Sequence, residues 1–270
     1  MRCSNAPSST WRTEMHRWGL LALMCFCLTA RATSIVILRS PERIYIGADS
    51  RRMYRDPAAT FEGTVCKIVP AGQFYFMASG LTYANDEQVA DLGADAGRNA
   101  HSIKAAVELL RRRMQQFLPA ALAAQKQIEH EDADVQRSLI LETAFAGVEN
   151  GSTLVSVQLY RRSGGDGRVK IESRTYSSST PGRYDFIFLG KRRAIDDRLA
   201  GQFPDIRTDR DAIGFITEMI NLEIAEAPET TAGPIDILKL DGSGARWLQE
   251  KPACGERQAR LFSLIVAERL

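Results

Sequence analysis

The sequence contains few histidines and few cysteines, and these scarcities exclude common kinds of active site. Three of the 270 residues are histidines, and His16 lies within the first 32 residues, which leaves His101 and His130. His101 begins a predicted helix and His130 lies in an acidic connection, so neither is placed to be the base for a serine nucleophile. The sequence has no HExxH motif and no cluster of Cys and His residues. We therefore expect neither a metal ion nor a cofactor.

The sequence also lacks a strong excess of charge of either sign. It has 35 basic and 33 acidic residues. Residues 1–32 hold four of the basic residues and one of the acidic ones, which leaves 31 basic and 32 acidic residues in the remainder. Because the remainder is nearly neutral, we expect no nucleic-acid partner.

A long apolar segment is absent as well. The apolar run at 18–28 has 11 residues, whereas a helix that spans a bilayer needs about 20. Arg12 and Arg17 precede this run, and the small-x-small pattern ARA follows it. These features predict a cleavable signal peptide over residues 1–32, and hence a periplasmic or secreted protein with no membrane span in its mature form. An uncleaved signal anchor is the alternative.

Cysteine is scarce beyond residue 32, where Cys66 and Cys254 remain. In an oxidising compartment these two thiols can form a disulfide. Their spacing does not decide the matter, because two buried thiols that act as small apolar side chains agree with the sequence equally well. Both interpretations stay open at this point.

The first half of the remaining chain predicts strands followed by helices. Two pairs of runs rich in β-branched and aromatic residues, each pair separated by a short turn, predict two hairpins that make an antiparallel sheet. The helices that follow have a 3.6-residue apolar period and are long enough to cover one face of that sheet. Ser102 is the predicted cap of the second helix. The predicted strands are 34–38, 43–48, 64–70 and 73–79, and the predicted helices are 86–100 and 103–128.

The second half repeats this order of strands and helices. Asn150-Gly151, a strong turn dipeptide, joins the strands of another predicted hairpin. The glycine-rich stretch at 163–167 indicates a loose turn and not a phosphate-binding loop, because no helix follows it. The predicted strands are 139–148, 152–160, 169–176, 184–189, 234–240 and 245–249, the predicted helices are 191–202 and 210–226, and residues 129–136 are a charged connection. The tail at 261–270 fits a strand or a helix equally well.

The order of these elements indicates the fold class. Separate blocks of strands and helices fit two antiparallel sheets that pack face to face, with a helical layer outside each sheet. No repeat or low-complexity linker interrupts residues 33–270. We therefore predict one α+β domain, built as a four-layer αββα sandwich.

Thr33 is a candidate nucleophile, because cleavage of the predicted signal peptide makes it the amino terminus. An N-terminal threonine carries a hydroxyl and a base, its own α-amine, on one residue. The unperturbed α-amine has a pKa of about 8, so it can take the hydroxyl proton directly or through one water. A neighbouring ammonium lowers that pKa. Lys67, on predicted strand 64–70, is placed to supply this charge, with Asp49 as its partner.

Four residues resemble, in order and nearly in spacing, the active-site residues of a known family. They are Thr33, Asp49, Arg51 and Lys67. They resemble the threonine, aspartate, arginine and lysine of proteasome β-type subunits and their bacterial relatives, which are N-terminal nucleophile (Ntn) hydrolases. Gly80, in a turn with Ser79, resembles the glycine whose backbone N–H forms the oxyanion hole of that family.

Longer stretches extend this resemblance, and two positions depart from it. Residues 144–159 resemble the middle hairpin of the family, and 230–240 resemble its segment near the C-terminal end. Where the family has Gly-Ser, this chain has Gly190-Lys191. Where the family has an acid three residues before Ser-Gly, this chain keeps the acid as Glu229 but has Ala232-Gly233. Both supporting serines are therefore replaced, which implies reduced or altered activity.

The resemblance implies an Ntn-hydrolase fold and an exported threonine hydrolase that cleaves amide bonds in a peptide or a small amide substrate. The implied site consists of Thr33 as nucleophile and base, Lys67, Asp49 and the oxyanion donor Gly80, with Arg51 and Glu229 completing it. It implies no cofactor. The alternative is a catalytically silent, proteasome-like assembly or binding protein. Because the family stacks helical layers into rings, and helix 103–128 carries an apolar stripe and three consecutive arginines, we also expect a homo-oligomer.

Overall fold

The computed structural model describes residues 33–55, 60–84, 87–128, 139–163, 168–177, 180, 182–252 and 254. The chain divides into two units, Met1–Ala30 and Arg31–Leu270, and every described residue belongs to the second. The predicted signal peptide, the charged connection at 129–136 and the tail at 261–270 lie outside the described residues.

The first large sheet has the strand order β12-β1-β2-β13-β14, with every neighbouring pair antiparallel. Strand β1, which pairs with β12 on one side and β2 on the other, is buried at all six positions. Ile35 and Ile37 lie in the core between the two sheets, whereas Val36 and Leu38 lie in the core on the opposite face. A strand that is covered on both faces appears in the sequence as an uninterrupted apolar run. The strands are β1 (Ser34–Arg39), β2 (Arg43–Ala48), β12 (Asp185–Gly190), β13 (Asp236–Asp241) and β14 (Gly244–Gln249).

The second large sheet has the order β11-β10-β9-β6-β5 and is also antiparallel. The predicted Asn150-Gly151 turn joins β9 and β10, and both of its residues have positive φ, as a tight hairpin turn requires. The strands are β5 (Ile68–Ala71), β6 (Phe74–Gly80), β9 (Leu139–Glu149), β10 (Ser152–Ser163) and β11 (Arg168–Tyr176).

Two predictions about the early strands are wrong. The first two hairpins do not share a sheet, because β1 and β2 pair with late strands while β5 and β6 pair with β9. Predicted strand 64–70 is interrupted, since β4 ends at Thr64 and β5 begins at Ile68. Two small sheets were not predicted. One consists of β3 (Arg51–Arg55) and β4 (Thr60–Thr64), between the two hairpins in the sequence, and the other of β7 (Tyr83–Ala84) and β8 (Glu87–Gln88), between the second hairpin and the first helix.

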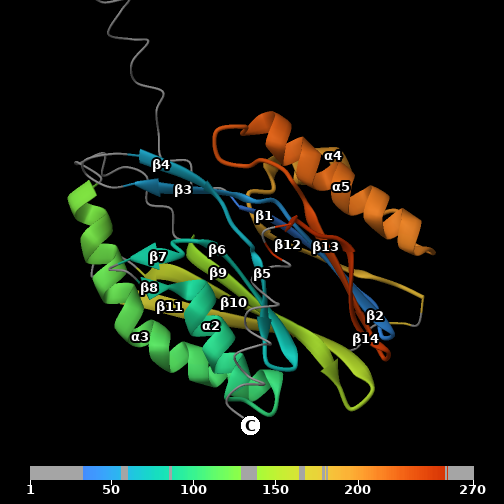
Figure 1. The fold of residues 1–270 in the computed structure, drawn as a ribbon, viewed down its shortest axis with the longest axis horizontal. Helices are drawn as coiled ribbons and strands as arrows, with labels where there is room; N and C mark the ends of the chain where they lie inside the picture. The colour runs from blue at the N-terminus through green and yellow to red at the C-terminus, as the bar shows by residue number, and fades with distance from the viewer. Residues whose placement is uncertain are drawn as a thin grey trace, which may run out of the picture. The chain divides into compact units, whose positions relative to one another are not determined.

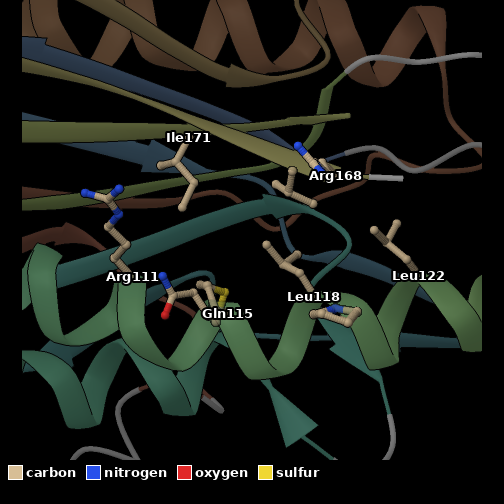
Figure 2. Close-up of a pocket in the computed structure, with 9 residues that line it drawn as sticks. Arg111, Gln115, Leu118, Leu122, Arg168 and Ile171 are labelled. Carbon is tan, nitrogen blue, oxygen red and sulfur yellow. The ribbon is translucent and has the colours of Figure 1, made fainter. Parts of the chain in front are cut away.

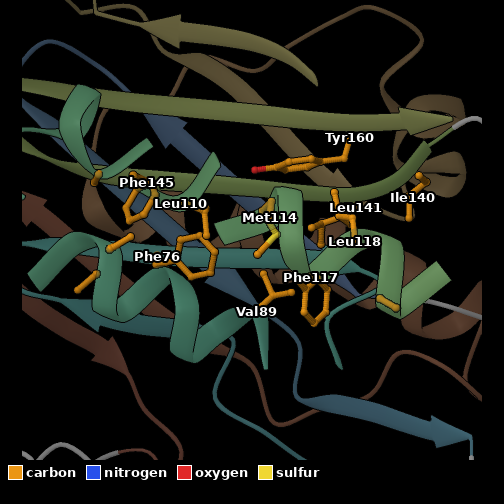
Figure 3. Close-up of a cluster of buried hydrophobic side chains, with 14 of the residues drawn as sticks. Phe76, Val89, Leu110, Met114, Phe117, Leu118, Ile140, Leu141, Phe145 and Tyr160 are labelled. Carbon is orange, nitrogen blue, oxygen red and sulfur yellow. The ribbon is translucent and has the colours of Figure 1, made fainter. Parts of the chain in front are cut away.

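Helices cover the outer face of each large sheet (Figure 1). On one side, α2 (Val89–Arg98) and α3 (Ile103–Ile128) pack on β6, β9 and β10, where Phe76, Leu110 and Phe145 share a core (Figure 3). On the other side, α4 (Arg193–Leu199) and α5 (Asp209–Glu226) pack on β1, β2 and β13. The described residues thus form two antiparallel sheets between two helical layers, an α+β sandwich.

Local sequence signals explain where two of these helices begin. The predicted Ser102 cap of α3 is confirmed, because Ser102 Oγ accepts a hydrogen bond from Ala105 N (3.1 Å). Thr208 and Asp211 form a reciprocal capping box at the start of α5. Within the described part of the chain, no helix is long and apolar enough to cross a membrane.

Candidate active site

The start of β1 places Thr33 between the ends of two neighbouring strands. Because β1 runs antiparallel to β2 and to β12, its first residues lie beside the last residues of both. Lys191 N, just after β12, donates to Thr33 O (3.1 Å), and Ser34 N donates to the Asp49 carboxylate (2.8 Å), just after β2. Asp49 N in turn donates to Ser34 O (3.2 Å). The backbone around Thr33 is therefore held from both sides.

The Asp49 carboxylate is the centre of the site. It is fully buried and accepts hydrogen bonds from Ser34 N, from the Lys67 ammonium (2.7 Å) and from Arg51 N (3.1 Å). A buried charge is tolerated where it is paired and hydrogen-bonded, and Asp49 meets both conditions. The expected ion pair between Asp49 and Lys67 is thus present, and Ser34 connects it to Thr33.

Lys67 reaches Asp49 from the irregular connection between β4 and β5. Its side chain is almost completely buried. The preceding residue, Cys66, forms a disulfide with Cys254, which decides between the two interpretations that the sequence left open. The sequence predicted that Lys67 lies on a strand. In the structure it lies instead in a connection that the disulfide cross-links.

Gly80 and Gly190 end β6 and β12 in conformations that favour glycine. Their φ angles are +103° and +89°. A Cβ added at Gly80 would lie 2.4 Å from Ile140 O. A Cβ added at Gly190 would lie 1.8 Å from Thr33 O and 2.6 Å from Ser79 Oγ, so Thr33 and Ser79 approach the same point. The end of β6, which carries the predicted oxyanion donor, therefore lies close to Thr33.

Glu229 lies in a turn at 228–230, and Arg51 contacts the same turn. The Arg51 guanidinium donates to the carbonyl of Pro228, the residue before Glu229. The Glu229 side chain is 60 % exposed, and its carboxylate lies 3.9 Å from the ammonium of Lys191, which also bonds Thr230 Oγ1 at 3.4 Å. An exposed pair at this distance contributes little to stability. Glu229 thus contacts the lysine whose backbone N–H holds Thr33 O.

Glu142 is a residue of this neighbourhood that the sequence analysis missed. It lies on β9 opposite Ser79 of β6, and its carboxylate accepts a hydrogen bond from Gly190 N (2.5 Å). Burial raises the pKa of Glu142 above its usual range, although the Gly190 N–H and the charges of Arg192 and Arg161 act in the opposite direction. The signal was a lone glutamate inside the apolar strand 139–148.

A second buried ion pair was also missed, beside Asp49. Asp236, the first residue of β13, pairs with Ala48 of β2, which directly precedes Asp49. The Asp236 carboxylate lies 2.7 Å from the Lys251 ammonium, and both side chains are 1 % exposed. Asp236 stands at the start of an apolar strand and offered a signal, whereas Lys251 follows the last strand in no recognisable pattern.

A separate cavity of about 350 Å³ lies between α3 and β11 (Figure 2). Its apolar wall includes Leu118, Leu122 and Ile171, with Arg111 and Arg168 also lining it. None of the six predicted site residues lines this cavity, which belongs to the layer between α3 and the second sheet.

The arrangement around Thr33 is one of threonine, lysine and carboxylates. Among the residues that the structure describes, no group of three or more His, Cys, Asp or Glu side chains is placed to hold a metal ion. In the uncleaved chain the Thr33 nitrogen is part of the peptide bond from Ala32, so it gains a basic lone pair only after cleavage there. The chain matches no protein-family model, and no curated protein matches it significantly.

Proposed function

We propose that this protein is an exported Ntn hydrolase in which Thr33, freed by removal of residues 1–32, cleaves amide bonds in a peptide or a small amide. The buried Asp49–Lys67 ion pair carries the proposal, since it is hydrogen-bonded to Ser34, the residue directly after Thr33. A buried lysine beside a candidate nucleophile is a typical feature of a functional site.

The proposed reaction uses the α-amine of Thr33 twice. The hydroxyl oxygen attacks the substrate carbonyl carbon while its proton passes to the neutral amine. The resulting oxyanion accepts a hydrogen bond from Gly80 N–H. When the C–N bond breaks, the leaving amine takes the proton from the Thr33 ammonium and leaves an ester on Thr33. A water molecule, deprotonated by the same amine, then attacks the ester carbonyl carbon. The bond from this carbon to the Thr33 oxygen breaks, the oxygen takes the proton back from the ammonium, and the acid is released.

In this mechanism the charge of Lys67 sets the protonation state of the amine. A nearby ammonium disfavours a second positive charge, so it lowers the pKa of the Thr33 α-amine and keeps the base neutral near pH 7. Asp49 balances the charge of Lys67 and fixes its position through a 2.7 Å hydrogen bond. The carboxylate therefore acts on the amine through Lys67.

Two further observations support the proposal. The arrangement of two antiparallel sheets between two helical layers agrees with the Ntn-hydrolase architecture that the resemblance implies. The disulfide between Cys66 and Cys254 agrees with export, because disulfides persist in oxidising compartments.

The first test is the amino terminus of the mature protein and the activity of Thr33→Ala. We expect sequencing of the exported protein to begin at Thr33, and we expect Thr33→Ala to abolish hydrolysis of a peptide-amide reporter without loss of folding or export. Thr33→Ser, which keeps a hydroxyl and an amine, is the matched control and should retain activity. A mature chain that begins elsewhere, or full activity in Thr33→Ala, contradicts the proposal.

A silent assembly or binding protein is the second candidate. The Lys191 ammonium occupies the position of a family serine and contacts Glu229, so the proposed site differs there from the family pattern. For this candidate, mature protein that begins at Thr33 would hydrolyse neither the reporter nor related amides.

A further inference from the structure

The second buried ion pair lies directly behind the proposed site. Asp236 accepts two hydrogen bonds from Lys251, one from its ammonium and one from its backbone N–H, both at 2.7 Å. Asp236 of β13 pairs with Ala48, the last residue of β2, and Asp49 directly follows Ala48. The Lys251 ammonium is close enough to Asp49 to be attracted by its charge. Two carboxylates and two ammonium groups thus form one buried cluster.

Lys251 also holds the connection that carries Lys67. Its ammonium donates to Val65 O (3.0 Å), two residues before Lys67. Val65 N donates to Ser50 O (2.9 Å), next to Asp49. Residues 65–67 belong to no strand, so no ladder of backbone hydrogen bonds fixes them in place. These contacts replace the missing ladder.

The disulfide joins the same two segments. Cys66 lies between Val65 and Lys67, and Cys254 lies three residues after Lys251. Lys251 and Cys254 are therefore both attached to the connection at 65–67, Lys251 through its ammonium and Cys254 through a covalent bond. A shift of either segment would move the backbone from which Lys67 extends to Asp49.

We propose that Asp236 and Lys251 are positioning residues, which hold residues 65–67 so that the Lys67 ammonium stays on Asp49 beside Thr33. The expected effect of these two residues on catalysis rests on the proposed function, whereas their expected effect on the position of Lys67 does not. Asp236 and Lys251 touch no substrate in this account. They act through Val65 and through the charge of Asp49.

The test compares three variants of the mature protein. Lys251→Met removes the ammonium but leaves the buried Asp236 carboxylate unpaired, which can prevent folding. The double variant Asp236→Asn/Lys251→Met removes both charges and therefore serves as the test if the single variant does not fold. Lys239→Met is the matched control. Lys239 also lies on β13 and forms a 3.0 Å ion pair with Asp209, but it pairs with Tyr45 in the strand register and so lies away from the end of the sheet that carries Thr33.

We expect both variants at Lys251 to lower kcat for the peptide-amide reporter by about 100-fold with little change in KM, because a small displacement of a catalytic group has an effect of that size. The pH profile of kcat should also change, since the displaced Lys67 no longer lowers the pKa of the Thr33 amine. Lys239→Met should leave both unchanged. A double variant that folds and keeps the kcat and pH profile of the wild type overturns the proposal.

A second measurement separates this proposal from the proposed function. In a Thr33→Ala background, the ¹⁵N–¹H signal of the Lys67 ammonium reports its protection from water and requires no activity. We expect this signal to be visible, and to be lost when Asp236→Asn/Lys251→Met is added. If the wild-type protein hydrolyses nothing but the signal behaves in this way, the proposed function fails and the positioning role stands. A signal that the added substitutions leave unchanged overturns the positioning role.

Discussion

Asp49 accepts hydrogen bonds from three parts of the chain, and among these three donors Lys67 alone carries a full charge. The two backbone donors, Ser34 N and Arg51 N, belong to the first residues of β1 and β3, so their positions do not depend on Lys67. Removal of the Lys67 side chain would therefore leave a fully buried carboxylate with two backbone hydrogen bonds and without its ion-pair partner. The stability of the fold depends on this side chain, and under the proposed function catalysis depends on it as well.

We predict that Lys67→Ala abolishes the proposed hydrolysis and lowers the free energy of unfolding by about 3–5 kcal/mol, the usual effect of breaking a buried ion pair. Lys67→Arg should restore part of the stability but little activity, because a planar guanidinium does not reproduce the position of a compact ammonium. Reporter hydrolysis and urea unfolding measure the two effects. Lys67→Ala with normal activity and an unchanged pH profile would show that the assigned role is wrong.

Glu142 gives a pH-dependent prediction. Burial raises the pKa of its carboxyl in the folded protein, so the folded state binds this proton more tightly than the unfolded chain does. The contribution of Glu142 to stability is therefore complete below the unfolded pKa of about 4.3 and is lost as the pH rises through the folded pKa. Glu142→Gln keeps an acceptor for Gly190 N but does not titrate.

We therefore expect the stability of Glu142→Gln, relative to the wild type, to increase between pH 4 and pH 7. Urea unfolding at both pH values measures this difference. An equal difference at the two pH values would mean that Glu142 titrates alike in the folded and unfolded states.

At the scale of elements, local patterns predicted hairpins and helices better than they predicted partners. The strands of β1, β2, β9 and β10 and the helix α3 were predicted with nearly the observed bounds, because each has a clear period or turn signal. The neighbours of β1 and β2 come from residues 185–190 and 236–241. No local pattern specifies such distant partners, so the division of the early hairpins between two sheets was not predictable.

The end of β12 provides a prediction about strand geometry. Gly190→Ala adds a methyl group that meets the Thr33 carbonyl, in addition to the strain of a positive φ. We expect it to destabilise the protein by more than the roughly 1–3 kcal/mol of strain alone and to reduce activity strongly. Thermal unfolding and reporter hydrolysis measure these effects.

Gly201→Ala is the matched control for Gly190→Ala. Gly201 has a similar φ of +79°, but an added Cβ there meets nothing within 4 Å. It should therefore show the strain without the loss of activity. Equal effects of the two substitutions would indicate that contact with Thr33 is unimportant.

At the scale of the whole molecule, the site is assembled from the two ends of the described chain. Thr33 and Lys67 come from the beginning, and Asp236, Lys251 and Cys254 come from the end, joined by a disulfide between residues 188 positions apart. By the chain-entropy model, a cross-link that closes so long a loop contributes about 5 kcal/mol. The Asp49–Lys67 pair was predictable from order and spacing, whereas the Asp236–Lys251 pair became visible in the folded structure.

Self-association is the remaining prediction at this scale. The structure excludes the apolar stripe of α3 as the contact surface. The apolar stripe of α3 is core, since Ile103, Leu110, Met114 and Phe117 are buried against the second sheet. Association through this helix must therefore use its exposed residues, which include Arg111, beside the cavity between α3 and β11, and Arg112.

Contacts between exposed charges are screened by salt, so we expect a homo-oligomer whose dissociation constant rises between 0.05 and 0.5 M salt. It should form without nucleotide, and Arg111→Glu/Arg112→Glu should weaken it further. Sedimentation of the mature protein at micromolar concentrations measures this, with Lys170→Glu/Arg174→Glu on the exposed surface of β11 as a charge-matched control. A monomer at every concentration and salt would refute self-association, whereas an oligomer that the α3 variant leaves intact would place the interface elsewhere.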